Sequence, residues 1–186
     1  YEIASCLVGS EMCIRDRHAS NTLPWFEVAK HTGAIIKYID LDEEGKVTLE
    51  NVRKAVTEHT KIISLAQITN VLGYLAPIKE ICNFAHEHDI IVCVDGAQSA
   101  PHHAVDVQDL DVDFFAFSGH KMCGPTGVGV LYGKYHLLEE MTPTRFGGGS
   151  NARYNSCGLV KLKNAPTKFE TGTPNIEGVI GLGSAI

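Results

Sequence analysis

Phe114-Phe115-Ala116-Phe117-Ser118-Gly119-His120-Lys121 has the pattern of a buried strand that ends in a lysine. A short apolar run bounded by glycine is typical of such a strand. Burial of an ammonium is costly, so desolvation lowers the pKa of a lysine in such a place. A lysine that has lost its proton can react as a free amine with a carbonyl. We therefore expect Lys121 to carry chemistry at the end of this strand.

A second apolar run, Ile90–Val94, ends in Asp95 and is followed by Gly96-Ala97-Gln98. An acid at one strand end and a lysine at another are what pyridoxal phosphate requires: the acid keeps the pyridine nitrogen protonated, and the lysine carries the aldehyde. Considered alone, a lysine after a strand is usually a solvated loop residue, and an acid in that place is often a helix N-cap. The pair, each member beside a glycine on adjacent strand–helix units, favours the cofactor.

The composition limits the classes of protein that the chain can represent. Its 186 residues are 44% hydrophobic, with a formal net charge of −6, which is typical of one soluble globular domain. No stretch approaches the ~20 apolar residues of a membrane span, and no basic block indicates nucleic acid. The six cysteines form no CxxC pair, so we expect free thiols and a cytoplasmic setting. Cys82 and Cys93 are expected to be small core residues.

Several short segments occur in the order and at the separations of a known family. They are Asn21–Trp25, Thr69–Gly73, Val94–Gln98, Ser118–Lys121, Gly124–Gly127, Gly147–Gly149 and Phe169–Asn175. From His18 onward the chain resembles the central part of a group II (SufS-type) cysteine desulfurase, a class V aminotransferase. The resemblance implies an α/β fold, the fold type I of the PLP-dependent transferases. Its large domain contains a mixed, mostly parallel sheet with flanking helices.

The first residues do not share this resemblance. Cys6–Arg17 resembles the translation of a sequencing adaptor. We therefore predict that residues 1–17 are a non-native leader and exclude them from the fold. The alternative is a genuine N-terminal strand and turn. Residues 18–186 are then expected to be part of a cofactor-binding large domain, and the small C-terminal domain is expected to be missing.

The resemblance assigns a role to each candidate site residue. Lys121 would hold the cofactor aldehyde and move protons, and His18 would stack on the ring and assist. The other implied contacts are Asp95 to the ring nitrogen, Asn70 and Gln98 to the phenolic oxygen, Ser118 and His120 to the phosphate, and Thr173 to the phosphate of the partner subunit in a homodimer. From the residues alone, Asn70 could equally be a turn asparagine, and His18 a solvated histidine.

The reaction implied by the resemblance is conversion of L-cysteine to L-alanine, with the sulfur passed to an enzyme cysteine as a persulfide. A sulfur-acceptor protein would then serve iron–sulfur cluster assembly. The persulfide cysteine and the arginine that binds the substrate carboxylate are expected outside this chain, so we do not expect the chain alone to be competent. Alternatives are a selenocysteine lyase or another class V lyase or aminotransferase, and a non-enzymatic interaction fragment.

Two further parts of the sequence contain residue types that can bind a metal or act as a nucleophile. His102-His103 and the aspartates at 106, 109, 111 and 113 follow no metal-ligand spacing, so we expect a polar loop and no metal. Cys123 is not expected to be the nucleophile, because the family's sulfur-accepting cysteine lies far downstream. The remaining patterns predict strands over 34–39 and 61–68 and helices over 24–32, 48–56, 135–141 and 178–186, with another opening at Pro77.

Overall fold

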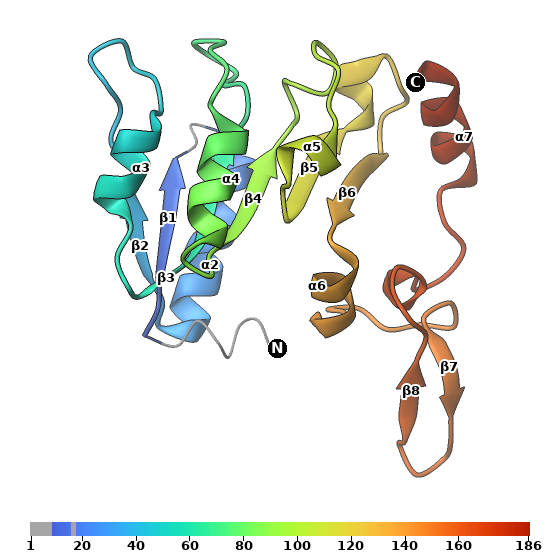
Figure 1. Ribbon diagram of the computed structural model, residues 1–186. Helices are drawn as coiled ribbons and strands as arrows, with labels where there is room; N and C mark the ends of the chain where they lie inside the picture. The colour runs from blue at the N-terminus through green and yellow to red at the C-terminus, as the bar shows by residue number, and fades with distance from the viewer. Residues whose placement is uncertain (1–8, 16–17) are drawn as a thin grey trace.

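The computed structural model describes residues 9–15 and 18–186, which form a six-stranded sheet with helices on both faces (Figure 1). The strand order is β2 (Ile35–Tyr38), β1 (Glu11–Arg15), β3 (Thr60–Ala66), β4 (Ile91–Asp95), β5 (Phe114–Ser118) and β6 (Gly129–Gly133). Neighbouring strands run parallel from β2 to β5, and β6 is antiparallel to β5. The predicted α/β fold with a mixed, mostly parallel sheet is confirmed.

The helices connect and cover the strands as expected for successive strand–helix units. They are α2 (Ala19–Thr32), α3 (Leu49–Ala55), α4 (Ile78–His86), α5 (Val107–Leu110), α6 (Tyr135–Glu140) and α7 (Ile176–Ala185), with 3-10 turns η1 (Gly119–Met122) and η2 (Thr167–Phe169). None of the helices in the described part of the chain has the length and apolar character that a membrane crossing needs. A separate hairpin of β7 (Asn151–Tyr154) and β8 (Val160–Leu162) projects away from the sheet (Figure 1).

The helix boundaries follow local capping chemistry. The Thr48 hydroxyl accepts the Asn51 N–H at 3.2 Å and begins α3. Gly33, at φ 72°, ends α2 in the left-handed conformation that glycine adopts without strain. The predicted start of α2 at Pro24 is wrong. The helix begins at Ala19 because His18 is its N-cap, and Pro24 lies inside it.

The exclusion of residues 1–17 from the fold requires a correction at β1. Glu11–Arg15 is an internal strand that pairs with β2 on one side and β3 on the other. Met12, Cys13 and Ile14 are each at most 1% exposed. Their apolar side chains can occupy this slot because an internal strand of a parallel sheet is covered on both faces. Residues 1–8 and 16–17 lie outside the described part of the chain.

The two faces of the sheet carry separate hydrophobic clusters. Ile63, Leu65, Val92 and Val94 point to the face covered by α3 and α4, where the larger core lies. Side chains alternate along a strand, so the residues between them point to the face covered by α2. There a smaller cluster contains Met12, Ala34 and Ile62, with Trp25, Val28 and Ala29 of α2 packed against it.

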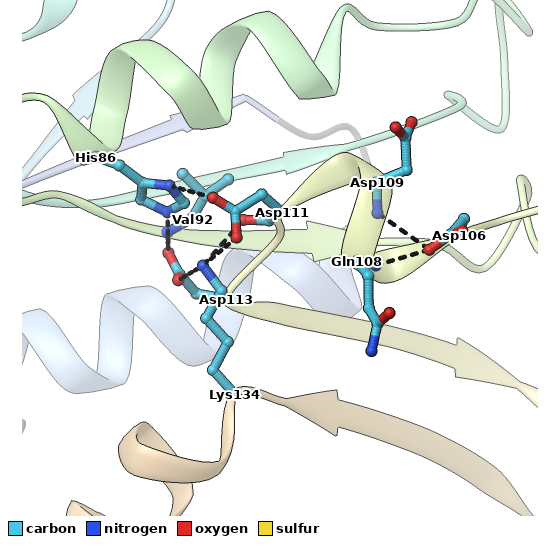
Figure 2. Close-up of polar contacts among 8 residues, drawn as sticks. All are labelled: His86, Val92, Asp106, Gln108, Asp109, Asp111, Asp113 and Lys134. Carbon is cyan, nitrogen blue, oxygen red and sulfur yellow. Dashed lines mark hydrogen bonds and ion pairs between the residues drawn. The ribbon is translucent and has the colours of Figure 1, made fainter.

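A cluster of charged side chains joins elements at the opposite end of the sheet from the carboxyl ends of β4 and β5 (Figure 2). His86, in the last turn of α4, contacts Asp111 through Nδ1 at 3.1 Å and Asp113 through Nε2 at 2.9 Å. Lys134, directly after β6, contacts the same carboxylates at 2.7 and 3.0 Å. His86 therefore joins the end of α4 to the two aspartates that precede β5.

Candidate active site

Asp95 and Ser118 lie at one edge of the sheet, at the ends of neighbouring strands. Asp95 is the last residue of β4 and pairs with Ala116 of β5, two residues before Ser118. Both strands run in the same direction, so their carboxyl ends meet at this edge, where open α/β sheets bind ligands. Lys121 follows on η1, immediately beyond β5. The two strand ends singled out in the sequence are therefore side by side.

A tight turn follows Asp95 and holds its backbone against β5. The Gly96 N–H donates to the Ala116 carbonyl at 2.8 Å, and the Ala97 N–H donates to Asp95 Oδ1 at 2.8 Å. A Cβ at Gly96 would lie 2.0 Å from Phe115 Cζ, so only glycine fits at this position. Turns and not a helix follow Asp95, so the helix N-cap alternative is wrong and this contact closes the turn. It uses one acceptor site of a carboxylate that has several, and the side chain also faces the cavity described next.

A cavity of about 610 Å³ opens between α2, the α2-facing side of β4 to β6, and the segment that follows α6. This volume lies within the ~300–1,000 Å³ range of small-molecule and cofactor sites. Its walls are mainly apolar, with Trp25, Phe114 and Leu131 among them, and its polar groups include Asp95 and Ser118. A flat apolar group with one cationic substituent would suit such a lining.

The apolar run of β5 is buried on one face only. Phe115 is 2% exposed and belongs to the core under α4, whereas Ala116 is exposed and lines the cavity. The expectation of a wholly buried strand is therefore wrong. Phe114 shares the α2 side with Ala116 and is half-buried, because no helix covers this part of that side. Phe117 is also half-buried but packs against the larger core with Phe115, and both Phe114 and Phe117 line the cavity.

The structure brings only some of the predicted residues to the cavity wall. Asp95 and Ser118 line it, and His18 is the N-cap of α2, two and three residues before Ser20 and Asn21, which also line it. The other candidates do not line the cavity. They are Lys121 and Gln98, half-buried, and Asn70, His120 and Thr173, exposed.

The sequence patterns did not indicate a hydrogen-bonded group that joins two residues of the cavity wall, Asn21 and Trp25, to a buried serine. Trp25 Nε1 donates to Ser64 Oγ at 3.0 Å, and Ser64 Oγ donates to Asn21 Oδ1 at 3.1 Å. Ser64 is 1% exposed and lies in the middle of β3. A serine between Ile63 and Leu65, in an otherwise apolar run, was the signal that could have indicated a buried polar contact.

Cys93 lines the cavity two residues before Asp95. Burial raises the pKa of its thiol to about 12, so the group is a neutral thiol at physiological pH. Cys82, fully buried on the sheet-facing side of α4, has its pKa raised to about 12 mainly by burial as well. The expectation of a core position thus holds for Cys82, whereas Cys93 lies between the core and the cavity. Cys123 and Cys157 are exposed.

The aspartates considered for a metal have other partners. Asp106 caps α5 by accepting the Gln108 and Asp109 N–H groups, and Asp109 pairs with Lys79. Asp111 and Asp113 are engaged by His86 and Lys134, as described above. Within residues 9–15 and 18–186 no group of three or more His, Cys, Asp or Glu side chains is arranged to hold a metal ion.

Comparison with known proteins identifies the family. The sequence profile of the aminotransferase class-V family matches residues 10–186, and the chain belongs to this family. It is 52% identical to a probable cysteine desulfurase of Halalkalibacterium halodurans over 181 residues, 96% of this chain and 44% of the relative. It is 43% identical to a cysteine desulfurase of Haloferax volcanii over 91% of this chain and 39% of the relative. The chain thus spans less than half the length of these relatives.

Solved structures with the same fold include enzymes that act on sulfur amino acids. The cysteine desulfurase CsdA of Escherichia coli, with an S-sulfonic acid, is 39% identical at a TM-score of 0.91, over 98% of this chain and 49% of that one. The apo cysteine desulfurase of Thermococcus onnurineus is 35% identical at a TM-score of 0.90, over 98% and 47%. A cystine C-S lyase bound to cysteine persulfide is 26% identical at a TM-score of 0.84.

Proposed function

We propose that this chain is the cofactor-binding part of a pyridoxal phosphate-dependent cysteine desulfurase of the group II subgroup. The observation that carries the proposal is the placement of Asp95 and Ser118 on the wall of one cavity, at the ends of adjacent strands, with Lys121 on the turn that follows. The similarity to cysteine desulfurases from bacteria and archaea supports it.

The residues present fit pyridoxal phosphate. Trp25, Phe114 and Leu131 offer apolar walls for the ring, and the Asp95 carboxylate is the partner that a protonated ring nitrogen needs. The Ser118 hydroxyl and the His120 ring can donate to a phosphate, and Lys121 provides a primary amine for the aldehyde. Amine, acid and anion-binding donors thus lie around one edge of the sheet.

Pyridoxal phosphate, when bound, supplies an electron sink for bonds at the substrate Cα. Asp95 would hold the proton at the ring nitrogen. Lys121 Nζ would hold the aldehyde and move the proton at Cα, while the His18 imidazole would stack on the ring and assist proton transfer. The remaining proposed contacts are Asn70 and Gln98 to the phenolic oxygen, Ser118 and His120 to the phosphate, and Thr173 to the phosphate bound by the partner subunit of a homodimer.

The proposed reaction breaks the Cβ–S bond of L-cysteine and forms an S–S bond to a protein thiol. Cysteine and the thiol give L-alanine and a persulfide, so atoms and electrons balance without a further oxidant. A sulfur-acceptor protein would take the persulfide sulfur toward iron–sulfur cluster assembly. We place this activity in the cytoplasm, where the thiols of Cys123 and Cys157 remain reduced.

Titration of the chain with pyridoxal phosphate, followed by absorbance, borohydride reduction and peptide mapping, tests the proposal. We expect a visible absorption band and a reduced label on Lys121. Lys121→Ala should lose both, and Asp95→Asn should bind more weakly and change the absorption maximum. Lys163→Ala is the matched control, because Lys163 is an exposed lysine that donates to the Gly149 carbonyl away from the cavity. A folded chain without a band, or a label spread over surface lysines, would contradict the proposal.

A further inference from the structure

A buried hydrogen-bond relay connects the middle of β3 to the start of α2. Trp25 Nε1 can only donate, so Ser64 Oγ is the acceptor at 3.0 Å. The single hydroxyl proton of Ser64 then goes to Asn21 Oδ1 at 3.1 Å. Both hydrogen-bonding functions of a side chain that is 1% exposed are thereby satisfied. We call Trp25, Ser64 and Asn21 the α2 relay.

The α2 relay lies one turn from the residue proposed to stack on the cofactor. The Asn21 N–H donates to the His18 carbonyl at 3.0 Å, and the Ser20 N–H donates to His18 Nδ1 at 3.3 Å. His18 is therefore held by the first turn of α2, and that turn is held to the sheet through Asn21. Asn21 and Trp25 also line the cavity.

The start of α2 needs this attachment because little else holds it. None of the α2 residues is buried, and the apolar contacts of the helix with the sheet come from Trp25, Val28 and Ala29, beyond its first turn. Pro24, which has no N–H, removes one backbone hydrogen bond from the helix. A helix start weakened in this way takes its position from side-chain contacts.

We propose that Ser64 is a positioning residue that, through Asn21 and Trp25, sets the place of His18 at the cavity. This inference rests on the proposed function for the role of His18 toward pyridoxal phosphate. Removal of the hydroxyl would leave the indole N–H and the amide oxygen to find other partners, and the first turn of α2 would move or fluctuate. Ser64 itself need not touch the cofactor.

Trp25 is the single tryptophan of the chain, so its emission reports on the relay directly. The experiment compares the wild-type chain with Ser64→Ala, using Trp25 emission, the ¹⁵N shift of the His18 ring and the affinity for pyridoxal phosphate by absorbance. Thr60→Val is the matched control: Thr60 is in the same strand, is also 1% exposed and accepts the Thr57 N–H at 3.0 Å at the opposite end. Circular dichroism verifies that each variant is folded.

We expect Ser64→Ala to shift the Trp25 emission and the His18 ring signal and to weaken cofactor binding about tenfold. Thr60→Val should lower stability without these changes. His18→Ala and the double variant His18→Ala/Ser64→Ala should bind equally, because the effect of Ser64 passes through His18. If Ser64→Ala does not fold, Ser64→Cys keeps a side chain of similar size with a weak donor and a weak acceptor, and it should shift the same two signals in the same direction.

Each outcome decides a separate point. Unchanged Trp25 emission and His18 signal in Ser64→Ala would overturn the relay, whether or not the cofactor binds. Additive losses in the double variant would show that Ser64 does not act through His18. A wild-type chain that binds no pyridoxal phosphate would overturn the proposed function, while the two spectroscopic signals would still decide whether Ser64 positions His18.

Discussion

Asp113 and His86 form a buried contact in which Asp113 Oδ2 lies 2.9 Å from His86 Nε2 (Figure 2). The same carboxylate oxygen accepts the Val92 N–H at 2.8 Å, and its neighbour Oδ1 lies 3.0 Å from Lys134 Nζ. One aspartate that is 4% exposed thus connects the end of α4, the start of strand β4 and the residue after β6. This contact fixes the relative position of the strands whose other ends form the candidate site.

Asp113→Asn should be among the most destabilising single changes in the chain. It removes a buried carboxylate charge from Lys134 and the acceptor of the Val92 N–H, and loss of one partner of a buried ion pair costs about 3–5 kcal/mol of unfolding free energy. Urea unfolding measures the change. Asp109→Asn is the control, since the Lys79–Asp109 pair is exposed and solvent screens it, so its loss should change stability far less. Equal losses in both variants would contradict a special role for Asp113.

Stability should depend on pH through Asp111 and Lys134. The hydrogen bond from Lys134 holds the pKa of the Asp111 carboxyl below 3.8, against a smaller opposing effect of burial. The stabilisation of the folded chain by the ionised Asp111 is complete above pH 3.8. It is lost as the pH falls through the lower pKa that Asp111 has in the folded chain. Burial tends to lower the pKa of Lys134, but hydrogen bonds to Asp111 and Asp113 outweigh it and raise the pKa above 10.5. Its stabilisation is complete below pH 10.5 and is lost above the raised value.

The pH dependence can be assigned with two variants. In urea unfolding across the pH range, Asp111→Asn should be less stable than wild type near pH 7, and the difference should shrink in acid below pH 3.8. The free energy of unfolding of Lys134→Met should differ most from that of wild type between pH 3.8 and pH 10.5. The two values should converge above pH 10.5. A difference that is constant with pH would show that these losses come from packing and not from charge.

Thiol reactivity should separate the cysteines by burial. In a Cys6→Ser background, the exposed Cys123 and Cys157 should react with a disulfide reagent at pH 8 within the mixing time of a manual assay. Cys82 and Cys93 should react slowly, because burial raises the pKa of both thiols to about 12 and leaves about one part in ten thousand as thiolate at pH 8. Mass spectrometry locates the label. Rapid labelling of Cys93 in the folded chain would contradict this description.

Gly96→Ala should destabilise the turn that carries Asp95 and Gln98. The added Cβ would lie 2.0 Å from the Phe115 ring, and overpacking of this kind costs about 1–3 kcal/mol. Phe115→Leu in the same chain should recover part of the loss. Gly183→Ala, in α7 with nothing within 4 Å of its Cβ, should instead be neutral or stabilising by about 1 kcal/mol. Unfolding free energies test all three changes, and a neutral Gly96→Ala would contradict the close approach.

Most of the fold could be predicted from local patterns, and the failures have physical causes. The end of the helix predicted over 24–32 and the start of the one predicted over 48–56 depend on neighbouring residues, and the caps Gly33 and Thr48 stand at these two places. The β7–β8 hairpin was not predicted, because its exposed strands show no alternation of buried and polar residues. The start of α2 was misplaced because the capping contact of His18 outweighs the preference of proline for the first turn.

The sequence by itself determined the strand–helix alternation and the positions of Asp95 and Ser118 at strand ends, since both follow from apolar runs and the residues that stop them. Only the tertiary structure decided that β1 occupies an internal slot, that one face of β5 is open to a cavity, and that Ser64 meets Trp25. Trp25 and Ser64 are 39 residues apart, and His86 and Asp113 are 27 apart. Contacts at such separations depend on how whole elements pack, which no local pattern encodes.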